Sequence, residues 1–191
     1  MARSLGEIAR LIGGVPGGAI LKGVTPGLAA SIDFPAPALT YCNGTHCSEV
    51  EVDAGTGAVR IVRSVLEHDA GRIINPMIVD GQVQGAVAHG IGAALTEWMR
   101  YDGGGQPQTV TYGDYLLPTT DIVPGVEIHH MASPTPLNPL GVKGAAESGT
   151  IAAPAAIASA IEDALTPFGV RIRDLPITPE RLVALIRAAR C

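Results

Sequence analysis

Two segments near residue 50 alternate polar and apolar positions as paired β-strands do. Residues 48–53 (SEVEVD) and 58–65 (AVRIVRSV) both repeat with a period of two, and the turn-forming residues 54–57 (AGTG) lie between them. This pattern predicts a β-hairpin. Further short extended segments are predicted at 109–112 and 126–131.

A helix is expected over residues 76–98, because its apolar positions recur with the period of an α-helix. One arc of roughly 120° holds the large apolar side chains, which are Val83, Val87, Ile91, Ala94, Leu95 and Trp98. The opposite side gathers small residues and one histidine, which are Gly81, Gly85, Ala88, His89 and Gly92. Glycine inside a helix costs about 1 kcal/mol relative to alanine, so such a row favours close approach of a backbone or a ligand. We therefore expect both faces to be buried.

Other helices are expected at 4–12, 153–165 and 179–189. Ser4 and Glu7 have the spacing of a capping box, Pro154 is expected in the first turn of its helix, and Thr178 is the expected N-cap of the last helix. Residues 13–38 form a Gly/Pro-rich connection, whose length suggests that something outside this chain covers it. Residues 133–150 are expected to form a long loop.

These elements do not alternate strictly as βαβ units, so the expected class is α+β. The predicted architecture is a β-hairpin and mixed short strands packed with a long glycine-faced helix and C-terminal helices. The expected division is 1–38, the first helix and its connection, and 39–191, the main domain.

Composition agrees with a globular domain and excludes several classes of protein. Hydrophobic residues make up 47% and charged residues 16%, which suffices for a core. The net charge of −5 comes without a basic patch, so a nucleic-acid-binding surface is not expected. Three cysteines are too few for a disulfide scaffold. The sequence shows neither an apolar leader segment nor about 18 uninterrupted apolar residues, so we expect a cytoplasmic protein without a membrane span.

Among the ionisable residues, Glu147 and His89 are the candidates for chemistry. Glu147 lies in GAAESG (144–149), whose small residues would let backbone N–H groups reach an anionic ligand, and a buried carboxylate there could act as a general base. Composition alone still favours a solvated loop glutamate. His89 lies on the glycine side of its helix and is equally explained as a core histidine bonded to a carbonyl.

Metal ligation by the chain itself is not expected. No pair of the five histidines has a helical ligand spacing, and no Cys-x-x-Cys is present. His129 and His130 are adjacent on a predicted strand, so their side chains should face opposite ways. Phosphate-binding loops of the Walker or Rossmann type are absent as well.

Five segments together resemble the C-terminal part of the molybdopterin-binding large subunit of the molybdenum hydroxylases. This family includes xanthine dehydrogenase, aldehyde oxidase and aerobic carbon monoxide dehydrogenase. The matching segments are THCSEVEVDAGTGAV (45–59), GRIINPMIVDGQVQGAVAHGIGAALTEW (71–98), TYGDYLLPTTD (111–121), PTPLNPLGVKGAAESGTIAAPAAIASAIEDAL (134–165) and LPITPERL (175–182).

The resemblance implies an oxidoreductase that oxidises a carbon centre of an aldehyde, an N-heterocycle or CO with water as the oxygen source. Molybdenum would be held by molybdopterin, often as its cytosine dinucleotide, and not by protein ligands. Glu147 would correspond to the catalytic base. The implied cofactor contacts are His89, Gly90, Lys143, Gly144, Ala145 and Ala146. Partner subunits would carry iron–sulfur clusters and FAD in a hetero-oligomer.

The chain also departs from the family. Ala146 stands where the family usually has glycine, and His89 stands where many members have glutamine. The chain resembles only the last part of a large subunit, so we expect a partner chain to carry the rest or the sequence to be a truncated piece. Two alternatives follow: a non-catalytic binding or assembly module that is a relic of the family, and an unrelated α+β binder of small ligands.

Overall fold

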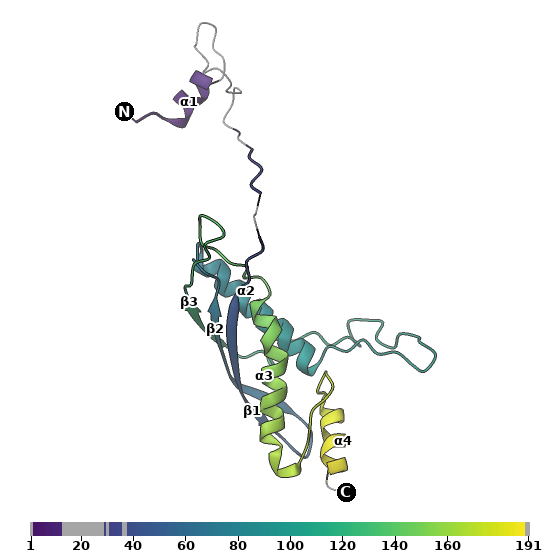
Figure 1. Ribbon diagram of the computed structural model, residues 1–191. Helices are drawn as coiled ribbons and strands as arrows, with labels where there is room; N and C mark the ends of the chain where they lie inside the picture. The colour runs from purple at the N-terminus through teal and green to yellow at the C-terminus, as the bar shows by residue number, and fades with distance from the viewer. Residues whose placement is uncertain (1, 13–28, 30, 36–37, 190–191) are drawn as a thin grey trace. The chain divides into compact units, whose positions relative to one another are not determined.

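The computed structural model describes residues 2–12, 29, 31–35 and 38–189 (Figure 1). They belong to two compact units, 1–36 and 37–191. Most of the predicted Gly/Pro-rich connection lies outside the described residues. The assignment of the two parts as domains stays a prediction.

The first unit contains α1 (Leu5–Ile12). The backbone N–H of Ser4 donates to Glu7 Oε2 at 2.7 Å, and the backbone N–H of Glu7 donates to Ser4 Oγ at 3.3 Å. These reciprocal bonds are the predicted capping box, which supplies partners for N–H groups that a helix start leaves free.

The second unit is built on a three-stranded mixed sheet in the order β1-β2-β3. Strands β1 (Asn43–Val52) and β2 (Val59–Asp69) form the predicted antiparallel hairpin, and β3 (Val126–Met131) lies parallel to β2. A parallel neighbour needs a crossover connection, and the chain makes it through α2 (Pro76–Leu95). The prediction of a strand at 109–112 is wrong. The chain turns there, and the Asp114 carboxylate accepts from the backbone N–H and the hydroxyl of Thr111.

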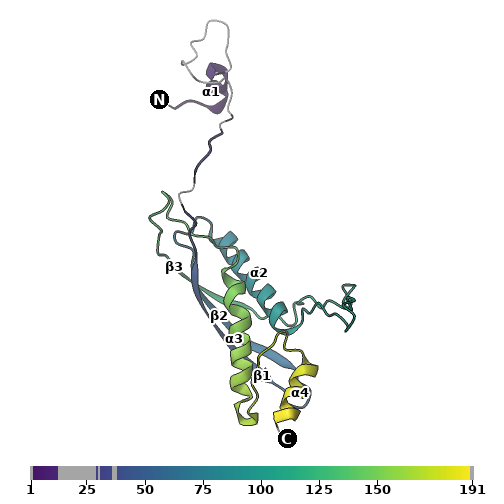
Figure 2. The ribbon, with the colours of Figure 1, turned by 45° about the vertical axis from the view of Figure 1, so that its right-hand side comes forward.

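Helices α2 and α3 (Ser148–Ala164) cover one face of the sheet and pack against each other (Figures 1 and 2). The short η1 (Thr166–Phe168) and α4 (Pro179–Ala189) follow. Side chains from all these layers form one core, in which each fully buried aliphatic residue contributes roughly 1.5–3 kcal/mol. Its most buried members are Leu66, Val83, Val87, Ile91, Ile157, Ile161, Leu165 and Leu182. The α+β class predicted from the sequence is confirmed.

Helix α2 differs from the prediction in its end and in its second face. It ends at Leu95, where the backbone N–H groups of Thr96 and Glu97 both donate to the carbonyl of Gly92. Trp98 therefore lies outside the helix, and the guanidinium groups of Arg100 and Arg181 lie 5.3 and 5.0 Å from the centroid of its ring. The expectation that both faces are buried is wrong for the described residues, because Gly81, Gly85 and His89 are exposed.

Helix α3 begins at Ser148, five residues before the predicted start, and this places Pro154 inside the helix instead of in its first turn. The early start follows from packing. A Cβ on Gly149 would lie 2.8 Å from the carbonyl oxygen of Val83 and 3.0 Å from Ala86 Cβ, so this first turn lies directly on α2. Helix α4 has the predicted bounds. No helix among the described residues is long and apolar enough to cross a membrane.

Candidate functional site

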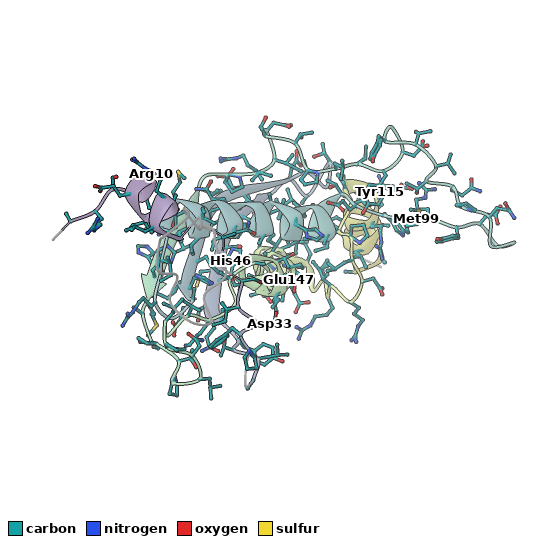
Figure 3. The ribbon with its side chains drawn as sticks, turned by 90° about the horizontal axis from the view of Figure 1, so that it is seen from above. Arg10, Asp33, His46, Met99, Tyr115 and Glu147 are labelled. Carbon is teal, nitrogen blue, oxygen red and sulfur yellow. The ribbon has the colours of Figure 1, made fainter. Side chains whose placement is uncertain are left out.

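Glu147 occupies the N-cap position of α3, immediately before the first helical residue. Its side chain is exposed and makes no capping hydrogen bond, and its backbone carbonyl accepts from the N–H of Thr150 at 3.1 Å. Figure 3, which looks down on the molecule from above, shows Glu147 at the near end of α3. A carboxylate at a helix N-terminus is favoured by the helix dipole. The Glu147 carboxylate is therefore exposed, with no side-chain capping bond of its own, and is accessible to a ligand outside the described chain.

The loop before Glu147 is pinned by backbone bonds on both sides. The N–H of Lys143 donates to the carbonyl of Ala70 at 2.9 Å, and the N–H of Gly144 donates to the carbonyl of Thr40 at 3.1 Å. On the same stretch, the N–H of Arg72 donates to the carbonyl of Gly141 at 3.0 Å. The loop thus behaves as a short extended segment held between two other parts of the chain.

The side chain of Lys143 is bound within the protein. Its Nζ lies 2.9 Å from Asp69 Oδ2, and both side chains are nearly buried, with exposed fractions of 12% and 7%. Burial by itself raises the pKa of the Asp69 carboxyl, but the Lys143 ammonium and the N–H groups of Gly71 and Ser133 outweigh burial and hold that pKa well below its ordinary range. Asp69 is therefore a carboxylate throughout the physiological range.

Residues 144–146 lead to Glu147 along the surface of the unit. Ala145 is half-buried, and its carbonyl accepts from Ser148 Oγ at 3.3 Å, whereas Gly144 and Ala146 are exposed. Among the described residues, every positive φ belongs to a glycine. The methyl group of Ala146 therefore imposes no backbone strain on this loop.

The glycines of α2 divide into two groups with different surroundings. A Cβ on Gly90 would lie 2.6 Å from Ala153 Cβ and 3.3 Å from Pro154 Cδ, so Gly90 faces α3 and packing requires it. At Gly81 and Gly85 an added Cβ would meet nothing within 4 Å, and His89 lies on the same exposed side. Nothing within the described chain requires glycine at those two positions, which leaves room for an external group to approach the helix.

Three further histidines lie on the strands of the sheet, and two of them, His68 and His130, contact each other. The sequence did not single them out as a group. His68 is fully buried, and neither of its ring nitrogens has a hydrogen-bond partner among the described residues. Its ring packs edge-on against His130, whose Nε2 lies 2.7 Å from Asp80 Oδ1. His46 Nε2 lies 2.9 Å from Ser64 Oγ. The alternation of β2, which places His68 on the face of Ser64 and Leu66, is the sequence signal that could have found it.

Burial lowers the pKa of His68, and the neighbouring His130 lowers it further. Burial also lowers the pKa of His46. Both rings are therefore neutral at neutral pH. In the described part of the chain, no group of three or more His, Cys, Asp or Glu side chains is arranged to hold a metal ion. A cavity of about 430 Å³ lies between residues 171–177 and α4, and none of the candidate residues lines it.

The second unit thus combines a mixed sheet, two covering helices and a glycine-rich loop that ends in an exposed carboxylate at a helix N-terminus. A comparison with known families shows where such a unit belongs. Residues 20–124, more than half of the chain, match the molybdopterin cofactor-binding domain, and the chain belongs to this family. Its relatives are large subunits of molybdenum-containing oxidoreductases, as the resemblance predicted.

Three relatives illustrate the similarity. Over 161 residues the chain is 43% identical to the nicotine 6-hydroxylase large subunit of Paenarthrobacter nicotinovorans, covering 84% of this chain and 20% of that protein. Quinoline 2-oxidoreductase from Pseudomonas putida 86 superimposes with a TM-score of 0.75 at 47% identity, over 76% of this chain and 19% of that one. CO dehydrogenase from Oligotropha carboxidovorans gives a TM-score of 0.81 at 28% identity, over 88% and 21%. The chain spans about a fifth of the length of these relatives.

Proposed function

We propose that this chain forms the cofactor-facing C-terminal part of a molybdenum hydroxylase and contributes its catalytic base, Glu147. The observation that carries the proposal is the free, exposed Glu147 carboxylate at the start of α3, at the end of a loop whose other end is pinned. Family membership supports the proposal, because its relatives are named as hydroxylases, oxidoreductases and dehydrogenases.

The residues present fit a molybdopterin group. Gly81 and Gly85 offer open space on an exposed helix face, and His89 on that face can donate or accept one hydrogen bond when neutral. The N-terminus of α3 and the backbone of Ala145 and Ala146 offer N–H groups to an anion, whereas the N–H of Gly144 is already bonded to Thr40. Lys143 and Gly90 belong to this site as supports, since the first binds Asp69 and the second packs on α3. The cytosine dinucleotide form of the cofactor is part of the proposal.

The reaction class is the two-electron oxidation of a carbon centre with oxygen from water. For an aldehyde or an N-heterocycle, a C–H bond and water give a C–OH bond, two protons and two electrons, and for CO, CO and water give CO2, two protons and two electrons. The cofactor, when bound, supplies the two-electron oxidation. Glu147 accepts a proton from the water-derived oxygen that attacks the substrate carbon, and its exposure on the loop lets it reach that oxygen. Iron–sulfur and FAD subunits would then receive the electrons.

Substrate and surroundings also belong to this proposal. An aldehyde, an N-heterocycle or CO would be the substrate, and the relatives named above take their names from nicotine, quinoline and CO. A partner polypeptide that carries the remainder of the large subunit belongs to the proposal, and exposed apolar side chains such as Met77 and Ile151 support a surface that another polypeptide covers. The cytoplasm is the expected location.

The competing function is a non-catalytic assembly module, motivated by Ala146 next to the base. The structure favours catalysis over this alternative, because Ala146 is exposed and free of backbone strain. A methyl group there therefore does not displace Glu147 through the backbone. The unrelated small-ligand binder is not supported, since the chain belongs to the molybdopterin-binding family.

The test is Glu147→Gln in the protein purified with its native partners. Removal of a general base should lower turnover by about 10²–10⁴-fold while the molybdenum content per complex stays that of the wild type. Glu180→Gln is the matched control, because Glu180 is an exposed carboxylate in the first turn of α4. A complex without molybdenum, or a Glu147→Gln complex with wild-type turnover, would refute the catalytic assignment.

A further inference from the structure

One buried carboxylate joins three segments of the chain at the end of β2. Asp69 Oδ1 accepts from the N–H of Gly71 at 2.8 Å and from the N–H of Ser133 at 3.1 Å, and Oδ2 accepts from Lys143 Nζ at 2.9 Å. Asp69 and Lys143 are 74 residues apart in the sequence. Three donors hold the buried Asp69 carboxyl as a carboxylate, with its pKa well below the ordinary range, so Asp69 is a poor proton acceptor.

The three bonds of Asp69 fix both ends of the loop that leads to Glu147. Ser133 follows β3 closely, and Lys143 stands four residues before Glu147. Backbone bonds from Lys143 to Ala70 and from Arg72 to Gly141 lie next to the ion pair. Without the ion pair, the Lys143 ammonium would have to leave its nearly buried position for water, and these backbone bonds would be strained or lost.

Beyond Lys143, few contacts hold the chain until the helix begins. Gly144 donates to Thr40, and Ser148 Oγ donates to Ala145, whereas Glu147 itself makes no side-chain capping bond. The place of the Glu147 carboxylate therefore depends on the packing of Gly149 on α2, on the backbone bonds of Lys143 and Gly144, and on the ion pair at Lys143. The ion pair is the side-chain contact among these that a substitution can remove without changing the helix.

We propose that Asp69 is a positioning residue for Glu147, acting through the ion pair with Lys143. Resting on the proposed function, this inference deepens it by giving Lys143 the role of an anchor for the catalytic loop. A displacement of about 1 Å at a reacting group costs up to about 10²-fold in rate, which is the scale on which such an anchor matters.

The test is Asp69→Asn in the holoenzyme, with Lys143→Met as a second variant in case the first fails to fold. We expect kcat to fall at least tenfold, with little change in KM and with wild-type molybdenum content. Amide hydrogen exchange at Lys143 and Gly144 should become at least tenfold faster, which is a readout independent of activity. Lys143→Arg, which keeps a cation opposite Asp69, should retain most of the wild-type kcat.

The matched control is Glu127→Gln, which removes the exposed ion pair between Arg63 and Glu127 on the same sheet. It should change neither kcat nor exchange in the loop, since exposed pairs contribute little. If Glu147→Gln abolishes turnover while Asp69→Asn and Lys143→Met leave kcat and loop exchange unchanged, the positioning role is wrong and the proposed function stands. If Glu147→Gln retains turnover, the proposed function itself fails.

Discussion

His68 is the residue whose buried state has the clearest consequence for stability. Its ring is fully buried with both nitrogens unpartnered among the described residues, and burial together with His130 lowers its pKa, while Asp69 opposes this weakly. The His68 ring of the unfolded chain binds a proton as the pH falls below its ordinary pKa of 6.5, whereas the ring in the folded protein is still neutral at that pH. Stability from this group is complete above that pH and is lost as the pH falls below it.

We predict that His68→Leu lessens the loss of stability between pH 7 and pH 5. At pH 7 the variant should lie within about 1.5 kcal/mol of the wild type, because the volume is similar and no protein hydrogen bond is broken. At pH 5 the difference should move in favour of the variant, while His46 keeps part of the pH dependence. Urea unfolding at both pH values measures this.

The control for that measurement is His129→Gln, since His129 is exposed on the opposite side of β3. Its unfolding free energy should follow the wild type at both pH values. A His68→Leu variant with the same pH slope as the wild type would show that His68 does not stay neutral on folding.

At the scale of elements, the contact between α2 and α3 depends on small residues. Gly90→Ala would place a Cβ 2.6 Å from Ala153 Cβ, and we predict a loss of about 1–3 kcal/mol of unfolding free energy from overpacking. Gly85→Ala meets nothing within 4 Å and should instead gain roughly 0.5–1 kcal/mol from helix propensity. Urea titration of both variants compares a packed and an open glycine in one helix.

The same pair of variants bears on the proposed cofactor. Gly85→Ala, although more stable, should lower the molybdenum content of the purified complex if the cofactor approaches the open face of α2. Equal stability changes in the two variants would contradict the packing argument. Unchanged molybdenum content in Gly85→Ala would contradict the proposed approach.

The elements with local signals were predicted well from the sequence, and those set by distant contacts were not. The capping box of α1, the hairpin and the bounds of α4 follow from residues that lie next to each other in the chain. The predicted start of α3 lies too late in the sequence, because residues 148–152 (SGTIA) favour a helix only weakly. The helix begins at Ser148 because Gly149 packs on α2. The parallel pairing of β2 with β3 has no local signal at all.

For the candidate site, the sequence located Glu147 just before a helix, and the structure places it at the N-cap. It could not show that Lys143 binds Asp69, because the partners are 74 residues apart and many carboxylates were available. The burial of His68 follows the alternation of β2, but its contact with His130 does not, since the pairing of β2 with β3 has no local signal. Long-range pairing of polar groups is therefore the part that required the structure.

At the scale of the whole unit, the chain between α2 and β3 has a different character from the sheet and its helices. It projects beyond the end of α2 in Figures 1 and 2, and it carries many exposed large apolar side chains. These are Met99, Tyr101, Val110, Tyr112, Leu116 and Leu117. Because this segment buries few apolar side chains, it can open locally while the core stays folded. The hydrogen bonds of Thr109 to Trp98 and Arg100 close it where it leaves α2.

Thr109 holds this segment closed next to the end of α2, so we predict that Thr109→Val opens the segment selectively. The buried Thr109 Oγ1 donates to the carbonyl of Trp98 at 2.9 Å and accepts from the N–H of Arg100 at 3.0 Å, and valine leaves both without that partner, at a cost of about 1–3 kcal/mol. Proteolysis between residues 99 and 117 should accelerate at least tenfold, while the urea midpoint of the core stays unchanged. Tyr112→Ser, at a side chain that is 85% exposed, should change neither quantity. A core midpoint that falls in step with the proteolysis rate would instead mean that this segment and the core unfold together.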